Sequence, residues 1–458
     1  MRTLRLAPLL LRGRISAGYG LIDLMSVAAF TLSGWLLLVV TAGMGAFYHR
    51  QLVPPDLFLA ALGDEAAYGA SQLVVWTILA ACASVLLIVP VLTLGAAAAR
   101  MGALGRDRRL AGLRLLGATG GQVVALSAIE TMLAALLGAL LGTLGYLGTL
   151  PLWASVTFQA TPLGAAEMLL PAAAIAGVVA LLVLLAGISS VGGLLRLRIS
   201  PLGVARRQPR KVLKLWRFLA LPAVVVAWVV IAPMLNLARE LVFSAAVIVG
   251  TLGVFMGVIN LVGPWLLQLL GLSLARSGRP AVLLAGRRLL ADPKAAWRSV
   301  AGLAFVGFTG GALVSLPDFT ADADPLVRIL GADVRTGTYL TLVIAFLVAA
   351  ASTLLNQAAA VLDRRTELKQ LANVGVPTML HDRTRLVEVV APAALSALGS
   401  GGLAVFFFGL LPRVGAQQLG VVPFAGTLLL GLVLVWAAGE ACRPLVRSAV
   451  TSVGPRLD

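Results

Sequence analysis

The stretch Arg106–Glu130, RDRRLAGLRLLGATGGQVVALSAIE, decides the fold that we predict for this chain. It begins with arginines, passes through glycines, and continues into a long apolar run that contains one carboxylate. The same outline returns 258 residues later (364 minus 106) in Arg364–Glu388, RRTELKQLANVGVPTMLHDRTRLVE. Five positions are identical at that offset: Arg106 and Arg364, Leu110 and Leu368, Leu113 and Leu371, Gly117 and Gly375, Glu130 and Glu388. The sequence therefore predicts two copies of one structural segment, both at the cytoplasmic face of a membrane.

The composition is typical of a polytopic membrane protein. Of the 458 residues, 60% are hydrophobic and only 12% are charged, whereas soluble domains are about 25% charged. Apolar blocks of the length of a helical span, roughly 20 residues, occur at about 25–46, 71–98, 122–150, 166–190, 217–235, 242–272, 299–317, 337–361, 386–412 and 421–441. These blocks are too long for barrel strands. We therefore predict an all-α polytopic membrane protein with ten transmembrane helices.

The net charge of +17 follows the predicted topology. With the N-terminus inside, 31 of the 36 Lys and Arg residues lie in inner segments, and five lie in outer loops. This split obeys the positive-inside rule and predicts that both termini are cytoplasmic. The basic excess therefore indicates contact with a lipid bilayer and no nucleic-acid partner.

The repeat divides the chain into three parts. Residues 1–195 and 276–458 would each form a four-span unit that opens with a basic amphipathic segment, at 1–22 and at Ala281–Trp297. Residues 196–275 would form a basic cytoplasmic linker followed by spans five and six. Six crossings separate the second spans of the two units, so the units are expected to be parallel repeats about an axis normal to the membrane.

Two further expectations concern the loops and the helix contacts. The longest outer loops, about 47–70 and 318–336, are too short for a folded domain, and the aspartates of the second loop are expected to be solvated. Small residues at helical spacing in spans three and six are expected to let neighbouring helices approach closely. These residues are Gly138, Gly142, Gly145, Gly253 and Gly257.

The sequence contains no motif for catalysis or for a cofactor. No segment has the form GxxxxGK[ST] of a nucleotide-binding P-loop or GxSxG of a nucleophile elbow. The two histidines, His49 and His381, are predicted on opposite sides of the membrane and so cannot share a metal. Two cysteines, Cys82 and Cys442, give no disulfide framework. We therefore predict that the chain is not an enzyme and holds no metal.

The carboxylates Glu130 and Glu388 lie within predicted spans, next to the two copies of the repeated stretch. A charge inside a membrane is costly and marks a functional candidate by default. One hypothesis is structural: each glutamate pairs with a basic residue of a neighbouring helix and fixes the adjacent segment. The other hypothesis is that one of them carries a proton.

At the repeated stretch the chain resembles the FtsX-like (MacB-type, type VII) permeases of bacterial ABC transporters. The match is carried by Leu110–Thr119, LAGLRLLGAT, between arginines and a span with an early glutamate. The second copy has an acidic residue, Glu367, at a position where the family usually has one, whereas the first copy has Arg109 there. The glycine turn of the second copy is NVGVP, at Asn373–Pro377. The ten-span plan is similar to that of bacitracin-resistance-type exporters, which have a large extracellular domain where this chain has only 318–336.

The resemblance implies a separate cytoplasmic ATPase that binds ATP and Mg, while this chain holds no cofactor. One chain with both copies would contact two ATPase subunits in the bacterial cytoplasmic membrane. The residues that the resemblance assigns to ATPase coupling are Arg106, Arg109, Leu113, Arg114, Gly117, Arg364, Glu367, Leu371 and Gly375. An extracytoplasmic partner is left open.

The expected function is therefore that of a permease subunit. ATP hydrolysis by the partner would drive export or extraction of an amphipathic, lipid-like or peptide substrate, or transmit force across the membrane. Two alternatives belong to other classes: a proton-coupled secondary transporter that uses no ATP, and a membrane signalling or scaffold protein. Co-purification with a P-loop ATPase separates the first hypothesis from the carrier.

Overall fold

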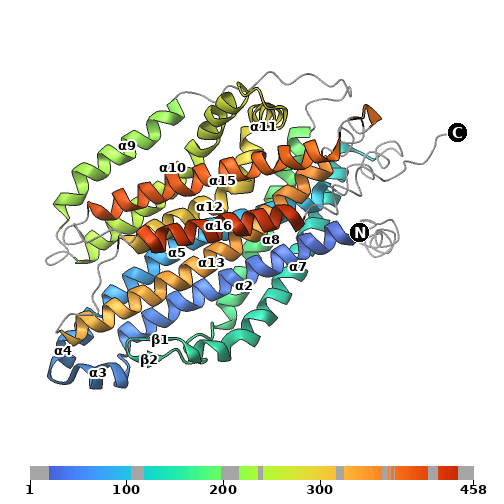
Figure 1. The fold of residues 1–458 in the computed structure, drawn as a ribbon. Coiled ribbons are helices and arrows are strands. Elements are labelled where there is room, and N and C mark those ends of the chain that lie inside the picture. Colours follow the sequence, from blue (N-terminus) through green and yellow to red (C-terminus); the bar gives the residue numbers. More distant parts are fainter. Residues whose placement is uncertain are drawn as a thin grey trace.

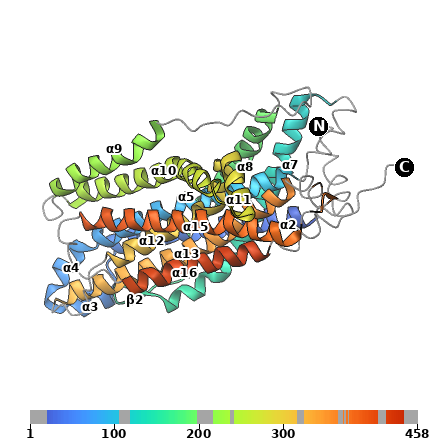
Figure 2. The ribbon, with the colours of Figure 1, turned by 45° about the horizontal axis from the view of Figure 1, so that its top comes forward.

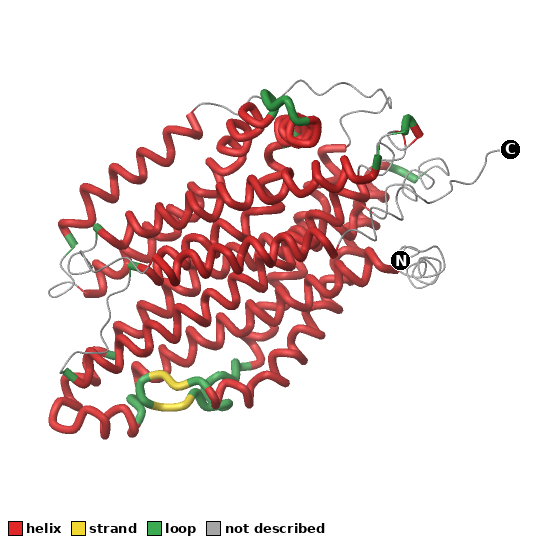
Figure 3. Tube along the Cα trace, in the orientation of Figure 1, coloured by secondary structure: helices red, strands yellow, loops and turns green. Residues whose placement is uncertain are grey.

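The computed structural model describes residues 20–104, 118–197, 216–235, 241–315, 324–363, 370, 373–375, 377–410 and 421–441. Over these ranges the chain forms a bundle of long helices with one two-stranded hairpin (Figures 1 and 3). The long helices are α2 (Gly20–Leu52), α5 (Val74–Leu104), α7 (Gly120–Thr149), α8 (Ala172–Leu197), α9 (Trp216–Ile231), α10 (Leu241–Leu274), α12 (Pro293–Val314), α13 (Pro325–Asp363), α15 (Thr378–Gly409) and α16 (Val421–Ala441). The short elements are α3 (Asp56–Leu62), η1 (Gly63–Glu65), α4 (Ala66–Gln72), η2 (Leu150–Ser155), β1 (Thr157–Phe158), β2 (Thr161–Pro162), η3 (Ala232–Met234) and α11 (Pro280–Ala291).

Each of the ten predicted apolar blocks coincides with one of the long helices. In the described residues, seven of these helices are long and apolar enough to cross a bilayer: α2, α5, α7, α8, α10, α13 and α15. Helix α9 belongs to a shorter apolar helix over Leu219–Met234. Helices α12 and α16 are the remaining two long helices that coincide with predicted apolar blocks. The structure thus confirms an all-α polytopic membrane protein.

Glycines bring α7 against α2, as the sequence predicted for part of its set. A Cβ atom on Gly138 would lie 2.5 Å from Cβ of Phe30, and one on Gly142 would lie 2.6 Å from the carbonyl oxygen of Thr31. The prediction was wrong for Gly257, where a Cβ would meet nothing within 4 Å. Periodicity identifies small residues on a helix, but the neighbouring helix decides which of them are needed.

The second predicted unit contains a similar contact with the roles of its helices exchanged. Here the glycines lie on its first helix, α12: a Cβ on Gly307 would lie 2.2 Å from the carbonyl oxygen of Ala397, and one on Gly311 would lie 2.4 Å from that of Gly401. Both carbonyl oxygens belong to residues of α15. Close backbone approach thus joins the first and third helices of each unit, but α7 supplies the glycines in one and α12 in the other.

Helices α5 and α13, the second helices of the two predicted units, lie side by side and run in the same direction (Figure 1). At their starts, Nε1 of Trp76 donates a hydrogen bond to Asp333 Oδ2 over 2.7 Å. Further along, Leu87 shares a buried cluster with Leu342, and Ala98 shares another with Leu355. Residues of α5 therefore face residues of α13 that lie about one repeat offset later in the chain.

The two intervening helices pack against the second unit. Figures 1 and 2 show α9 as the outermost helix on its side, next to α10. The buried indole of Trp228 stacks on Phe407 with ring centroids 4.2 Å apart and donates to the Phe407 carbonyl oxygen over 3.0 Å. Amphipathic helix α11, the second predicted basic segment, ends at Ala291, because Asp292 and Pro293 separate it from α12.

The bundle has two different ends. One end, which we call the hairpin end, holds β1, β2, α3, α4 and the start of α13 (Figure 1). The opposite end, which we call the basic end, holds the last residues of α5, α8 and α13. In the sequence these helices are followed by the arginine-rich segments 105–117, 198–215 and 364–369, which lie outside the described residues. Two helix starts at the hairpin end differ from the predicted blocks. Helix α13 begins at Pro325, earlier than the predicted 337, and α8 begins at Ala172, later than the predicted 166.

Candidate functional site

Most of the predicted coupling residues lie outside the described residues. These are Arg106, Arg109, Leu113, Arg114, Gly117, Arg364, Glu367 and Leu371. The structure places the other three predicted site residues, Gly375, Glu130 and Glu388, at the basic end. There, α7 begins at Gly120 and α15 at Thr378, which again differ by 258 (378 minus 120). The repeat seen in the sequence thus corresponds to two helices that start at equivalent positions.

The turn before α15 uses glycine and proline. Gly375 has φ +87, a backbone conformation that favours glycine because it has no Cβ. Pro377 then precedes the first turn of α15 with φ −66 and no side-chain cap. A Cβ on Gly375 would meet nothing within 4 Å, so the conformation of the backbone, and no close neighbour, requires glycine here.

The start of α7 is capped by side chains. The Thr119 hydroxyl accepts a hydrogen bond from the Gln122 backbone N–H over 3.4 Å, and the Gln122 side chain accepts one from the Thr119 N–H over 2.9 Å. This reciprocal arrangement is a capping box, which satisfies two N–H groups that a helix start leaves without partners.

Glu388 on α15 forms an ion pair with an arginine of a neighbouring helix. Nη1 of Arg288, on α11, lies 3.5 Å from Glu388 Oε2, and both side chains are largely buried. A second contact lies beside it, since Arg385 Nη2 is 4.0 Å from Glu440 Oε1 of α16. Two cations and two carboxylates thus connect α15 to α11 and α16, as the structural hypothesis for Glu388 expected.

Glu130 on α7 lies in a different environment. Its side chain is partly buried, and its Oε2 atom is enclosed. The hydroxyl of the next residue, Thr131, donates to the Ser127 carbonyl oxygen over 2.8 Å and lies 3.2 Å from the Ser190 hydroxyl of α8. At the repeat offset, Ser127 occupies the position of Arg385. The hydroxyls of Thr131 and Ser190 thus join α7 to α8 about one turn from the position at which a charge joins α15 to α16.

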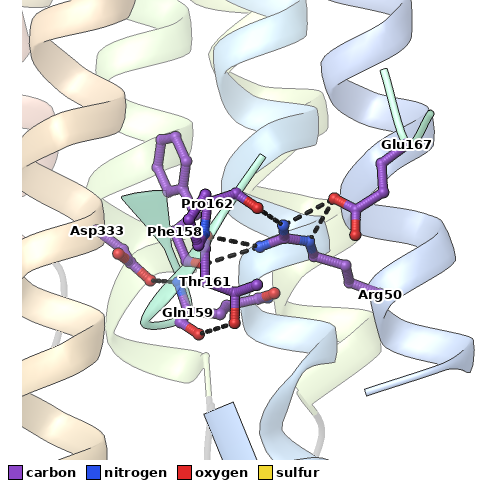
Figure 4. A network of polar contacts seen from close by, with 7 residues as sticks. All are labelled: Arg50, Phe158, Gln159, Thr161, Pro162, Glu167 and Asp333. Atoms are coloured by element: carbon purple, nitrogen blue, oxygen red, sulfur yellow. Dashed lines mark hydrogen bonds and ion pairs between the residues drawn. The ribbon is translucent and has the colours of Figure 1, made fainter. Parts of the chain in front are cut away.

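The hairpin end contains a buried polar network that the sequence did not reveal (Figure 4). Arg50, at the end of α2, is only 1% exposed and uses all of its N–H groups. Its Nε and Nη2 atoms donate to Glu167 Oε2 over 2.9 and 2.7 Å, and Nη1 donates to the Phe158 carbonyl oxygen over 2.8 Å. The carbonyl oxygens of Pro162 and Thr161 accept at 2.8 and 3.4 Å. The guanidinium thus fixes the hairpin and the following turn onto α2.

Asp333 holds the hairpin from the other side, as Figure 4 shows. Its Oδ2 atom accepts hydrogen bonds from the Gln159 backbone N–H and from Trp76 Nε1, each over 2.7 Å. The prediction of a solvated aspartate in a loop was wrong, because Asp333 lies on α13 and is 7% exposed. A carboxylate removed from water needs such donors, and they come from segments too distant in sequence to be recognised.

The turn of the hairpin has an unusual backbone. Its two central residues, Gln159 and Ala160, have φ +56 and +52, values that two-residue hairpins usually assign to Asn-Gly or Gly-Gly. The Gln159 side chain is fully buried, and neither its oxygen nor its nitrogen has a hydrogen-bond partner among the described residues. Contacts from Arg50 and Asp333 therefore hold a turn for which its own residues have little preference.

An open apolar groove of about 640 Å³ lies between α7 and α8. Its lining is almost entirely aliphatic: Leu136, Leu140, Thr143, Ala172, Ile175, Ala176, Val179, Ala180, Val183 and Leu184. In a bilayer such a surface faces lipid tails, so bilayer lipid itself can fill it. The described residues include no group of three or more His, Cys, Asp or Glu side chains that could hold a metal ion.

Comparison with known proteins does not identify the chain. No protein-family model matches it, and no curated protein matches it significantly. The likeness to FtsX-like permeases therefore rests on the residues quoted above, chiefly Leu110–Thr119.

Proposed function

We propose that this chain is the membrane permease subunit of an ABC transporter, moved by a separate cytoplasmic ATPase. The observation that supports this most is the parallel pair of α5 and α13. Helix α5 ends at Leu104, next to the first arginine-rich copy, and α13 ends at Asp363, next to the second. A force applied to either copy would therefore act on the end of a long helix of the central pair.

The ends of the two helices also suggest how movement is passed on. At the hairpin end, Trp76 of α5 and Asp333 of α13 are hydrogen-bonded to each other, and Asp333 also holds the hairpin between α7 and α8. Arg50 connects the same hairpin to α2. A tilt of the central pair would thus reach α2, α7 and α8 through this polar network. The result would be export or extraction of an amphipathic substrate, or force transmission across the membrane.

The ion pair of Glu388 favours this mechanism over a proton-coupled carrier. The carboxylate of Glu388 lies 3.5 Å from Nη1 of Arg288 and thereby connects α15 to α11. This geometry suits a structural anchor. ATP and Mg would be bound by the ATPase, with one ATPase subunit on each arginine-rich copy.

Co-purification tests the proposal. The chain, expressed in its native bacterium with an affinity tag and extracted in mild detergent, should bring down a P-loop ATPase in stoichiometric amount. Reconstitution should raise the ATPase rate of that partner. A chain that purifies to homogeneity without an ATPase, and stimulates none encoded beside it, would refute the proposal.

The proposed orientation has the hairpin end outside, the basic end inside and both termini cytoplasmic in a bacterial inner membrane. In a chain whose two cysteines are replaced by alanine, Asp64→Cys should react with an impermeant thiol reagent in intact cells. Lys294→Cys should react only after the membrane is opened. The opposite pattern would reverse the orientation without affecting the fold.

A further inference from the structure

The short elements that precede α5 form a small platform at the hairpin end. We define the platform as α3, η1 and α4, residues 56–72. Phe58 and Leu62 point inward and share a buried cluster with Trp76 of α5 and Leu326 of α13. Gly69 permits the close fold, because a Cβ there would lie 2.1 Å from Leu62 Cδ1. The platform is thus a packed unit and not a loose loop.

The opposite face of the platform carries large apolar side chains exposed to solvent. Leu57 is 57% exposed and Tyr68 is 61% exposed, and Leu52 and Val53 at the end of α2 are similarly exposed. Exposed apolar patches of this kind mark interaction sites when they lie in water. The question is therefore whether this patch lies in water or in lipid.

The position of the platform along the bundle places it in water. It packs on Leu326, whereas the apolar block of α13 begins near residue 337. At 1.5 Å per residue, about 16 Å of helix separates the platform from the start of that block. Figure 1 also shows α3 and α4 at the far end of the bundle, beyond the hairpin. The apolar block of α5 also begins only at about residue 71, where the platform ends. We therefore infer that Leu57 and Tyr68 lie at or beyond the edge of the lipid tails.

The charge of the platform differs in sign from that of the chain. Residues 51–73 contain no Lys, Arg or His, although the whole chain has a net charge of +17. Three carboxylates, Asp56, Asp64 and Glu65, are exposed around the apolar side chains. Arg50, which precedes the platform, is buried and bonded to Glu167, so that among the described residues Arg328, two residues from Leu326 on α13, is the exposed arginine beside the three carboxylates. A complementary surface would thus be apolar with cations around it.

We propose that the platform is the docking surface for an extracytoplasmic polypeptide segment that is amphipathic and cationic. Leu57 and Tyr68 supply the apolar contact, and the three carboxylates select the charge. The inference rests on the proposed orientation, which puts the hairpin end outside. It does not depend on whether the partner is transported or only binds.

A docked segment would be connected directly to the central helix pair. The ring of Phe58, beneath the platform surface, meets Trp76 edge to face with centroids 5.7 Å apart. Nε1 of Trp76 in turn donates to Asp333 on α13. Binding on the platform would therefore bias the same two helices whose opposite ends lead to the arginine-rich copies.

A peptide-binding experiment tests the docking surface. The protein is placed in nanodiscs of neutral phosphatidylcholine, and the probe is a fluorescent amphipathic helix of leucine and lysine. Its counterpart with glutamate in place of lysine is the charge control, and empty nanodiscs measure binding to lipid alone. We expect the lysine peptide to bind the protein about tenfold more tightly than either comparison, a difference of about 1.4 kcal/mol. The preference should decline at high salt, since exposed charges are screened.

Variants locate the binding. Leu57→Ser with Tyr68→Ser should remove most of the affinity, and Asp56→Asn, Asp64→Asn and Glu65→Gln together should abolish the preference for lysine. All five side chains are exposed, so the unfolding temperature should not change. The matched control is Leu152→Ser, which removes an equally exposed leucine at the same end and should leave binding unaltered.

Three outcomes would overturn the docking surface. Binding that is equal in empty nanodiscs would be partition into lipid. Binding that survives both sets of variants would lie elsewhere on the protein. A dimer in light scattering that Leu57→Ser disrupts would show that the platform is covered by a second copy of the chain. If Asp64→Cys labels only from inside, the orientation fails, and this result can be told apart from a platform that lies outside but binds nothing.

Discussion

The starts of α7 and α15 occupy equivalent positions in the repeat, yet different chemistry holds each of them. Helix α7 begins with a capping box formed by Thr119 and Gln122, and hydroxyls connect it to α8. Helix α15 begins after Gly375 and the uncapped Pro377, and ion pairs connect it to α11 and α16. The comparison teaches that, among the contacts of the described residues given above, helices that start one repeat offset apart can be held by hydroxyl groups in one case and by ion pairs in the other.

The two solutions differ in what their loss would cost. A hydroxyl that loses its partner leaves one neutral group unsatisfied, at about 1–3 kcal/mol. A largely buried charge that loses its partner costs about 3–5 kcal/mol. Loss of a contact in the second copy is therefore expected to cost more stability than loss of a contact in the first.

The largest effect is expected at Arg288. Arg288→Ala leaves the largely buried Glu388 without its cation and should lower the free energy of unfolding by about 3 kcal/mol. Denaturant unfolding in detergent, followed by circular dichroism, measures the change. The double variant Arg288→Leu with Glu388→Leu removes both charges and should recover much of the loss. Equal stability of Arg288→Ala and the native chain would show that the pair is not what holds α15.

The next effect concerns ATPase coupling through the two glycine turns. Gly117→Val should lower the stimulated ATPase rate about tenfold, corresponding to ~1.4 kcal/mol, because the first copy keeps the LRLLGAT turn. Valine is strained at the φ of +87 that Gly375 adopts, but Gly375→Val should lower the rate less than Gly117→Val, because the second copy lacks the LRLLGAT sequence. The reconstituted complex provides the measurement, with binding of the ATPase checked separately. Equal losses in the two variants would contradict the asymmetry.

A smaller effect is expected at the capping box. Thr119→Ala removes the side-chain oxygen that accepts from Gln122 and should cost about 1 kcal/mol of stability. Thr119→Ser keeps the oxygen and should be nearly neutral. Pro377→Ala, at the equivalent position in the second copy, removes no cap and should change stability less than Thr119→Ala. The same denaturation assay compares the three, and a larger loss for Pro377→Ala would reverse the comparison.

The smallest effect is expected at Glu130. Glu130→Gln keeps the shape of the side chain and one accepting oxygen, so only a charge-assisted contribution of about 1 kcal/mol is lost. Activity should fall modestly, with an unchanged pH dependence of the ATPase-driven reaction. Complete loss of activity, with normal expression and intact ATPase binding, would support the proton-carrier hypothesis instead.

The sequence predicted the helices well because each depends on a local property. Apolar length placed the long helices, seven of which in the described residues are long and apolar enough to cross a bilayer. The starts of α7 and α15 are separated by the repeat offset. The pairing of Glu388 could also be anticipated, because a carboxylate within an apolar helix needs a cation nearby. Its identity could not, since Arg288 lies on a separate helix that packs on α15 only in three dimensions.

The hairpin end could not be predicted for the same reason. Arg50 and Asp333 look like ordinary loop charges in the sequence, and Glu167 lies at the edge of an apolar block. Their partners are mostly backbone carbonyl and amide groups. A residue pattern does not show which backbone carbonyl groups will accept hydrogen bonds from a side chain. One signal was present in the sequence: Asp333 lies only about one helical turn before the apolar block that begins near residue 337. Asp333 thus continues the helix of that block.

The length of α13 has a mechanical consequence. Its 39 residues extend about 58 Å at 1.5 Å per residue, nearly twice the thickness of the hydrocarbon core. A helix of that length is a lever arm, and a tilt of about 5° about one end displaces the other by about 5 Å, close to one helical turn. The platform rests near the tip of this lever, beside Leu326. It would therefore travel farther than any residue within the bilayer, and spin labels on Leu57 and Lys294 would report the largest change in distance during ATP turnover.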